Sequence, residues 1–205
     1  MISSVLMFIE VTANRLARRR TKNRIGCIRH FEAKVVTFVI LFAAFSWASA
    51  QTHCKSQEDL VFSCKIQKSR KVVSLCATTQ VVDGKMKTVA LQYRFGKPNA
   101  PRELEFPLSE TDSLEQFKLN QYFGSQVFST NISFTIGEFD YAINDSEEQR
   151  IPSFHMAGVT VVSRITNKQL DLRCETKSVY SDWGVISGVV PCDEGATMNA
   201  CEYKK

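Results

Sequence analysis

Few side chains in this sequence have the types and spacing that catalysis needs. Glu138 and Asp140 lie two residues apart, so an extended chain would place both carboxylates on one face, and glycosidases use such pairs. His155 is the candidate general base, but the sequence identifies no carboxylate to orient it. The same residues also fit a solvated strand face and a surface histidine. Because no nucleophile elbow, Walker loop, HExxH or EF-hand motif accompanies them, we predict no catalytic residue, cofactor or metal site.

Basic residues gather around one predicted polar turn at 67–70. Lys65, Lys68, Arg70 and Lys71 lie in this turn or beside it. Such a cluster could contact an anionic partner, such as a cell-wall polymer or an acidic patch on an envelope protein, or it could be a solvated turn. These four residues are the candidate partner-binding surface.

The first fifty residues have the pattern of an export signal. A basic region at 1–34 precedes an apolar run at 35–47, and the small residues 48–50 follow as a cleavage site. The apolar run is shorter than the roughly 20 residues that span a bilayer, so cleavage before Gln51 is favoured over retention as an anchor. The sequence therefore predicts a periplasmic or secreted protein with one β-rich domain at 51–205.

Removal of this leader changes the charge balance. The chain carries 26 Lys and Arg and 21 Asp and Glu, of which eight and two lie in the leader, so residues 51–205 carry almost equal numbers of acids and bases. A near-neutral domain has no strong electrostatic attraction to nucleic acid or to an anionic membrane. We therefore expect neither as a partner after cleavage.

Six cysteines remain after cleavage, and an oxidised framework needs an even number. Their spacing matches no common zinc pattern. Cys64 and Cys76 are equidistant from Arg70, so a hairpin centred there would join them across two strands. The two other predicted disulfides are Cys192–Cys201, which would close the C-terminal tail, and Cys54–Cys174, which would be a long-range link.

Alternation of apolar and polar residues dominates the chain after Gln51 and predicts strands. Asp83-Gly84, Gly137 and 166–168 are turn signals, whereas 109–119 and 144–152 resemble loops. The predicted strands include 60–66, 71–78, 88–95, 103–106, 120–139, 154–164 and 169–175. About eight short strands predict an all-β fold, namely an antiparallel β-sandwich or small barrel braced by disulfides.

One arginine interrupts the core pattern of the predicted strand 88–95. Tyr93 and Phe95 belong to its core face, so Arg94 must project from the other face. We expect Arg94 to pair with Glu103 or Glu105 on a neighbouring strand, as a structural pair rather than a ligand clamp.

Several of these segments together resemble a known group of proteins. FSC at 62–64, SLCA at 74–77, LQYRFG at 91–96 followed by Pro98, and ELEFP at 103–107 are similar to the pattern FSC…SLCA…LQYRFG.P…ELxxP. Small, uncharacterised secreted or periplasmic proteins of proteobacteria share this pattern, and looser matches continue to about residue 175. The resemblance implies a bacterial envelope or secreted protein and brings no established activity.

These features favour an exported, monomeric, non-catalytic binding module of the bacterial envelope. A small protein inhibitor would be one version, by analogy of size and disulfide use alone. Its partner would be an envelope protein or a cell-wall polymer. Two alternatives stay open: a cell-wall or glycoside hydrolase built on Glu138, Asp140 or His155, and a membrane-anchored structural protein if the leader is retained.

Overall fold

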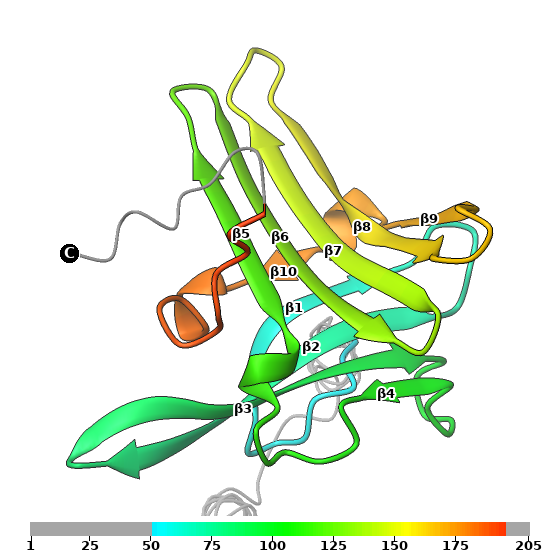
Figure 1. Cartoon of the computed structure of the whole chain (residues 1–205). Coiled ribbons are helices and arrows are strands. Elements are labelled where there is room, and N and C mark those ends of the chain that lie inside the picture. Colours follow the sequence, from blue (N-terminus) through cyan, green and yellow to red (C-terminus); the bar gives the residue numbers. More distant parts are fainter. Residues whose placement is uncertain (1–50, 196–205) are drawn as a thin grey trace, which may run out of the picture. The chain divides into compact units, whose positions relative to one another are not determined.

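Two antiparallel five-stranded sheets make up the part of the chain that the computed structural model describes, residues 51–195 (Figure 1). The first sheet has the order β10-β1-β2-β3-β4 and the second the order β5-β6-β7-β8-β9. Strands of the second sheet run steeply across those of the first (Figure 1). The all-β prediction is confirmed, and among these residues the sheets form a sandwich rather than a closed barrel.

Most strands agree with the predicted segments within a few residues. The first sheet contains β1 (Asp59–Lys65), β2 (Val72–Val82), β3 (Lys85–Gly96), β4 (Leu104–Phe106) and β10 (Tyr180–Ser181). The second sheet contains β5 (Lys118–Phe123), β6 (Val127–Ile136), β7 (Phe139–Glu148), β8 (Phe154–Ser163) and β9 (Gln169–Arg173). Single turns of 3₁₀ helix are η1 (Leu114–Gln116), η2 (Thr176–Ser178) and η3 (Trp183–Val185).

β10 of the first sheet was not among the predicted strands, and two predicted elements of the second sheet differ from the structure. A turn divides the predicted strand 120–139 and makes β5 a separate strand. The Gly124 N–H closes this turn by donating a hydrogen bond to the Val127 carbonyl at 2.8 Å. The predicted loop 144–152 is wrong at its start, because β7 continues to Glu148. Inward-facing positions of β7 continue past Ile143 to Asp145, so a carboxylate occupies a core-side position.

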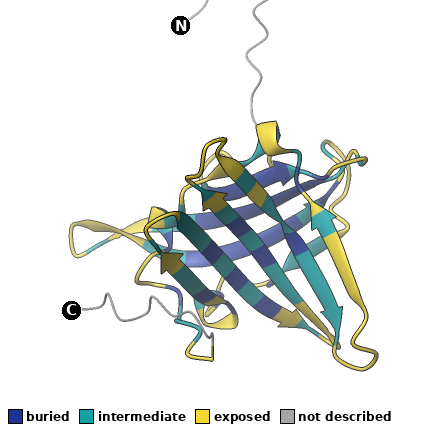
Figure 2. Ribbon diagram, turned by 90° about the horizontal axis from the view of Figure 1, so that it is seen from above, coloured by how far each residue is buried: buried dark blue, intermediate teal, exposed yellow. Residues whose placement is uncertain are grey.

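The hydrophobic core lies between the facing sides of the two sheets. Aromatic rings fill its centre: Phe134 stacks on Tyr141 with ring centroids 5.1 Å apart and on Phe106 at 5.0 Å. Buried and more exposed residues alternate along the strands (Figure 2). Full burial of one large apolar side chain contributes about 1.5–3 kcal/mol. The fully buried apolar side chains of the core include Phe62, Val73, Leu75, Leu91, Phe117, Ile132 and Ile143.

A strap formed by residues 51–58 covers the outer face of the first sheet. The Ser63 hydroxyl donates to the Gln51 carbonyl at 3.0 Å, and the His53 N–H donates to the Ser74 hydroxyl at 2.9 Å. The strap explains why Ser63, Ser74 and Arg94 are buried although they lie on the side of the sheet that faces away from the core.

The disulfides join other cysteines than predicted. Cys54 is bonded to Cys76 and Cys64 to Cys174, so the predicted pairs Cys64–Cys76 and Cys54–Cys174 are wrong. Cys64 lies opposite Val73 in the β1–β2 register, so the hairpin is not centred on Arg70. A shift by an odd number of residues reverses the face on which a side chain lies. Cys64 therefore faces the core, whereas Cys76 faces the strap.

Each disulfide fixes a junction of the fold. The Cys54–Cys76 bond holds the strap on β2. The Cys64–Cys174 bond joins the two sheets at the corner where Ile66 and Cys174 form an isolated β-bridge. Cys192 is also disulfide-bonded, but Cys201 lies outside the described residues, so the predicted pair Cys192–Cys201 stays a prediction.

These bonds indicate that the protein matures in an oxidising, extracellular type of environment. Residues 51–195 contain no helix with the length and apolar character that a membrane crossing requires. The predicted signal peptide at 1–50 lies outside the described residues.

Candidate functional site

A cavity of about 580 Å³ opens beside the inner face of the second sheet. Its wall on the sheet comes from β5, β6, β7 and β8, and its opposite wall comes from the segment that follows β10. The volume lies in the range of small-molecule sites, which are concave, largely apolar and lined by a few polar groups. Side chains that line the cavity include Gln121, Phe123, Phe128, Thr130, Asp145, Glu147 and His155 from the sheet and Trp183 from the opposite wall.

Asp145 organises one side of the cavity. The Nε2–H of His155 donates to Oδ1 of Asp145 at 2.6 Å, and the indole N–H of Trp183 donates to Oδ2 at 2.8 Å. Asp145 is buried, so these two donors compensate for the water that its carboxylate has lost. Trp183 also stacks on the buried ring of Phe62, with centroids 5.6 Å apart. The carboxylate thus fixes β8 and η3 to β7.

This arrangement supplies the orienting carboxylate that the sequence did not identify for His155. Ser181 and Ser187 line the same cavity, but within residues 51–195 Asp145 is the hydrogen-bond partner of the His155 ring and neither serine joins it. A nucleophile is activated by a base within hydrogen-bond reach. The described part of the site therefore holds a positioned histidine without an assembled nucleophile.

The paired carboxylates Glu138 and Asp140 lie at the other end of β7 from Asp145 and Glu147. Both are exposed, and Asp140 accepts a hydrogen bond from Thr135 at 2.7 Å. Neither lines the cavity. The structure therefore places them on a solvated strand end, away from His155.

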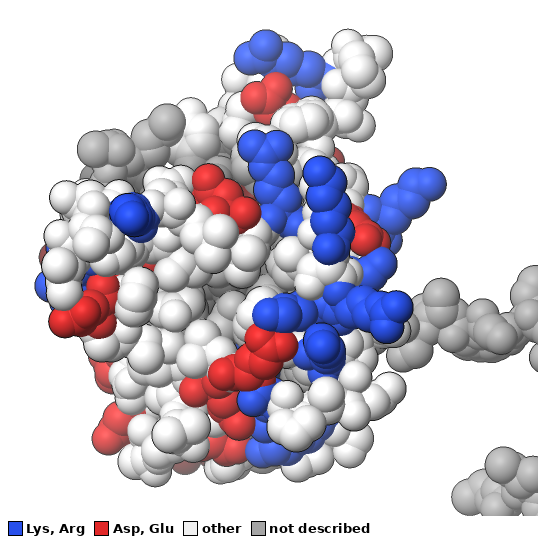
Figure 3. Space-filling model, turned by 90° about the vertical axis from the view of Figure 1, so that its right-hand side faces the viewer, with Lys and Arg blue, Asp and Glu red and all other residues white. Residues whose placement is uncertain are grey.

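The candidate partner surface is only partly free. Lys65 forms an ion pair with Glu175 at 2.8 Å, and Lys71 forms one with Glu103 at 2.6 Å. Lys68 and Arg70 lie in the turn, where Lys68 has a left-handed backbone with φ of 56°. Basic side chains gather on this side of the molecule, with acidic side chains among them (Figure 3). The surface therefore carries both basic and acidic side chains, and its role in binding stays a prediction.

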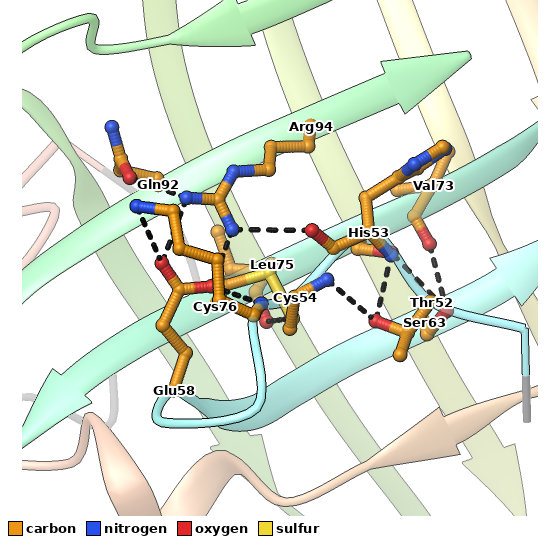
Figure 4. Close-up of a disulfide and its surroundings, with 12 residues drawn as sticks. Thr52, His53, Cys54, Glu58, Ser63, Val73, Leu75, Cys76, Gln92 and Arg94 are labelled. Atoms are coloured by element: carbon orange, nitrogen blue, oxygen red, sulfur yellow. Dashed lines mark hydrogen bonds and ion pairs between the residues drawn. A yellow bond between two sulfur atoms is a disulfide. The ribbon is translucent and has the colours of Figure 1, made fainter. Parts of the chain in front are cut away.

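Arg94 lies in a buried ionic network beneath the strap (Figure 4). Its guanidinium donates to both carboxylate oxygens of Glu58, and its Nε–H donates to Glu105 at 2.8 Å. The predicted structural pair with Glu105 is confirmed, whereas Glu103 binds Lys71 instead. The side chain of Arg94 is 0% exposed and that of Glu58 is 2% exposed, so neither can act as a ligand clamp in this arrangement.

The network shifts the titration of its members. Burial disfavours the charged form of Glu58, but hydrogen bonds from Arg94 and from the Lys55 N–H outweigh it, so the pKa of Glu58 lies below its ordinary value. The pKa of Glu105 is lowered in the same way, because hydrogen bonds from Arg94 and Arg102 outweigh burial. Both carboxylates therefore stay ionised into mildly acidic conditions.

A set of possible metal ligands lies beside this network. Cys54, Cys76 and Glu58 are close enough together to share an ion. Because the two sulfurs are bonded to each other, they offer no thiolate to a metal. This cluster is a structural junction.

Comparisons of the chain with protein-family models, with curated proteins and with solved structures gave no match. The cavity and its residues are therefore the basis for any functional assignment.

Sequence reasoning identified one member of the cavity, His155, and missed its partners. The signal for Asp145 was present, because the alternation of Tyr141 and Ile143 continues to it. Trp183 could not be assigned in this way, because the segment that carries it is irregular and contacts Asp145 across 38 residues of chain.

Proposed function

We propose that this protein is an exported binding module of the bacterial envelope, periplasmic or secreted, and that the cavity is its ligand site. The predicted leader, the disulfides and the absence of a recognisable catalytic motif support export and binding.

The observation that carries the assignment is the hydrogen-bonded set of Asp145, His155 and Trp183 on the cavity wall. Two donors on one buried carboxylate hold the imidazole and the indole in fixed positions before any ligand arrives. Binding sites gain affinity when their groups need not be ordered on binding. The set therefore favours a rigid recognition site.

A fluorescence titration tests this function directly. The chain has two tryptophans, Trp47 in the leader and Trp183 in the cavity, so the fluorescence of the cleaved protein reports on the cavity alone. Soluble cell-wall fragments and fractionated envelope metabolites are the probes. We expect at least one fraction to shift the emission saturably in the native protein and much less in D145A. A protein whose emission responds to no fraction would contradict the assignment.

Hydrolysis is the second candidate function, because the 2.6 Å bond between His155 and Asp145 orients a general base. A panel of cell-wall and glycoside substrates distinguishes the two functions. Turnover that disappears in H155A would favour a hydrolase. Binding without turnover would favour the module.

The basic turn is a separate proposal about a macromolecular partner. An anionic polymer or an acidic protein patch would contact Lys68 and Arg70, whose side chains form no ion pair within the described residues. Recovery of a defined envelope partner, lost when Lys68, Arg70 and Lys71 are changed to alanine, tests this surface. An unchanged recovery would remove the turn from consideration.

A further inference from the structure

The carboxylates of the cavity have no lysine or arginine counterpart on its described wall, and the imidazole of His155 is hydrogen-bonded to Asp145. Asp145 and Glu147 are the acidic residues that line it, and no lysine or arginine does so among residues 51–195. This local excess contrasts with the balanced charge of the chain after the leader. The described cavity wall therefore carries acidic side chains without lysine or arginine, in a domain whose total charge is nearly balanced.

The two carboxylates have different roles. Asp145 is buried, and both of its oxygens accept hydrogen bonds from the wall. Glu147 is exposed and lies directly opposite His155 in the β7–β8 register. Within the described residues no hydrogen bond or ion pair engages the Glu147 carboxylate. Glu147 thus offers an uncompensated charge to a ligand in the cavity.

The aromatic rings of the cavity also attract cations, as the free carboxylate does. Phe123 and Phe128 line the cavity with ring centroids 6.1 Å apart, and Trp183 lines the opposite wall. The faces of aromatic rings attract cations, and tryptophan does so most strongly. A ligand with a positive group on an apolar body would satisfy both the free carboxylate and the rings.

On the basis of the proposed function, we propose that the cavity selects organic cations, that is, amines or guanidinium compounds carried on an aromatic or alkyl body. The cationic group binds beside Glu147, and the apolar body lies between the aromatic walls. Neutral sugars and anionic fragments lack the group that Glu147 would bind.

Three probes of similar size test the ligand class: 2-phenylethylamine, 2-phenylethanol and phenylacetate. Trp183 fluorescence of the cleaved full domain gives each affinity. The ammonium compound should bind at least about tenfold more tightly than the alcohol, which corresponds to about 1.4 kcal/mol, and the anion should bind most weakly. Raising the salt concentration should reduce the difference.

Two variants locate the charge. E147Q should lower the affinity for the amine about tenfold, to that for the alcohol. E148Q is the matched control, because Glu148 is the next residue on β7, points to the other face and pairs with Arg150 at 3.5 Å. A charge preference that survives E147Q, or that E148Q removes equally, would overturn the proposal.

The outcomes also separate this inference from the proposed function. If the alcohol, or a neutral cell-wall sugar, shifts Trp183 fluorescence at the same concentration as the amine, the cation class is wrong and the cavity remains a ligand site. If no probe or envelope fraction changes the fluorescence, both the cation class and the ligand site are wrong.

Discussion

Arg94 is the centre of the buried ionic network on the first sheet. It balances Glu58 and Glu105; its own side chain and that of Glu58 are almost fully buried, whereas the Glu105 side chain is partly exposed. Removal of one partner from a buried ion pair leaves an uncompensated charge, which costs about 3–5 kcal/mol. We therefore expect R94A to lower the free energy of unfolding by about that amount in urea denaturation.

Lys71 provides the matched comparison for this prediction. Its pair with Glu103 is also short, at 2.6 Å, but both side chains contact solvent. Exposed pairs contribute about 0–1 kcal/mol, so K71A should change stability little. Equal losses in R94A and K71A would contradict the role given to the buried network.

The lowered pKa of Glu58 predicts an acid limit to stability. A carboxylate with a lowered pKa in the folded state stabilises the fold fully above its ordinary value, here 4.5, and loses that contribution as the pH falls through the folded-state pKa. Stability should therefore fall as the pH drops below about 4.5. E58Q removes one titrating group, so its stability should change less steeply with pH across this window than that of the native protein.

Urea denaturation at stepped pH values measures this slope. E148Q, at a surface pair on the second sheet, serves as the control variant. An E58Q protein with the native slope would show that the network does not set the acid limit.

At the scale of elements, the two disulfides close loops of different length. Cys64 and Cys174 are 110 residues apart, whereas Cys54 and Cys76 are 22 apart. In the chain-entropy model these bonds contribute about 5 and about 3 kcal/mol. We expect C64A/C174A to be more destabilised than C54A/C76A in thermal unfolding.

The shorter loop has a local effect that the longer one lacks. C54A/C76A should increase amide hydrogen exchange in the strap at 51–58, while the sheets stay protected. A strap that remains fully protected without its disulfide would mean that Arg94 and the serines hold it alone.

Alternation of apolar and polar residues predicted most strands, because successive side chains of a strand point to the buried and the exposed face in turn. The segments predicted at 71–78 and 88–95 became β2 and β3, and Asp83-Gly84 is their turn, with φ of 54° and 72°. The predicted disulfide pairs were wrong because pairing depends on strand register. The β1–β2 turn is not centred on Arg70, so Cys64 and Cys76 lie on opposite faces of the sheet.

The site was less predictable than the fold for a related reason. The sequence shows His155 as a possible base, but the position of its ring depends on Asp145 of β7, which in turn accepts a hydrogen bond from Trp183 of η3. The outward direction of Arg94 was predictable from alternation, whereas the strap that buries it was not, because its contacts are made by an irregular segment.

At the scale of the whole molecule, the cysteine inventory makes a simple prediction. Residues 51–205 contain six cysteines, of which four form two disulfides with one another and Cys192 is also disulfide-bonded. We expect denatured but unreduced exported protein to show no reactive thiol, and reduced protein to show six. A reactive thiol in the unreduced protein would contradict the oxidised framework.

The two disulfides are interlaced in the chain, because Cys64 lies between the members of one pair and Cys76 between the members of the other. A chain that enters an oxidising compartment from its N-terminus presents Cys54 and Cys64 first, and rapid oxidation would join this wrong pair. Attack by a later thiolate must then reshuffle the bond. Production of this protein in native form should therefore depend on a disulfide isomerase, and a host that only oxidises should accumulate scrambled isomers.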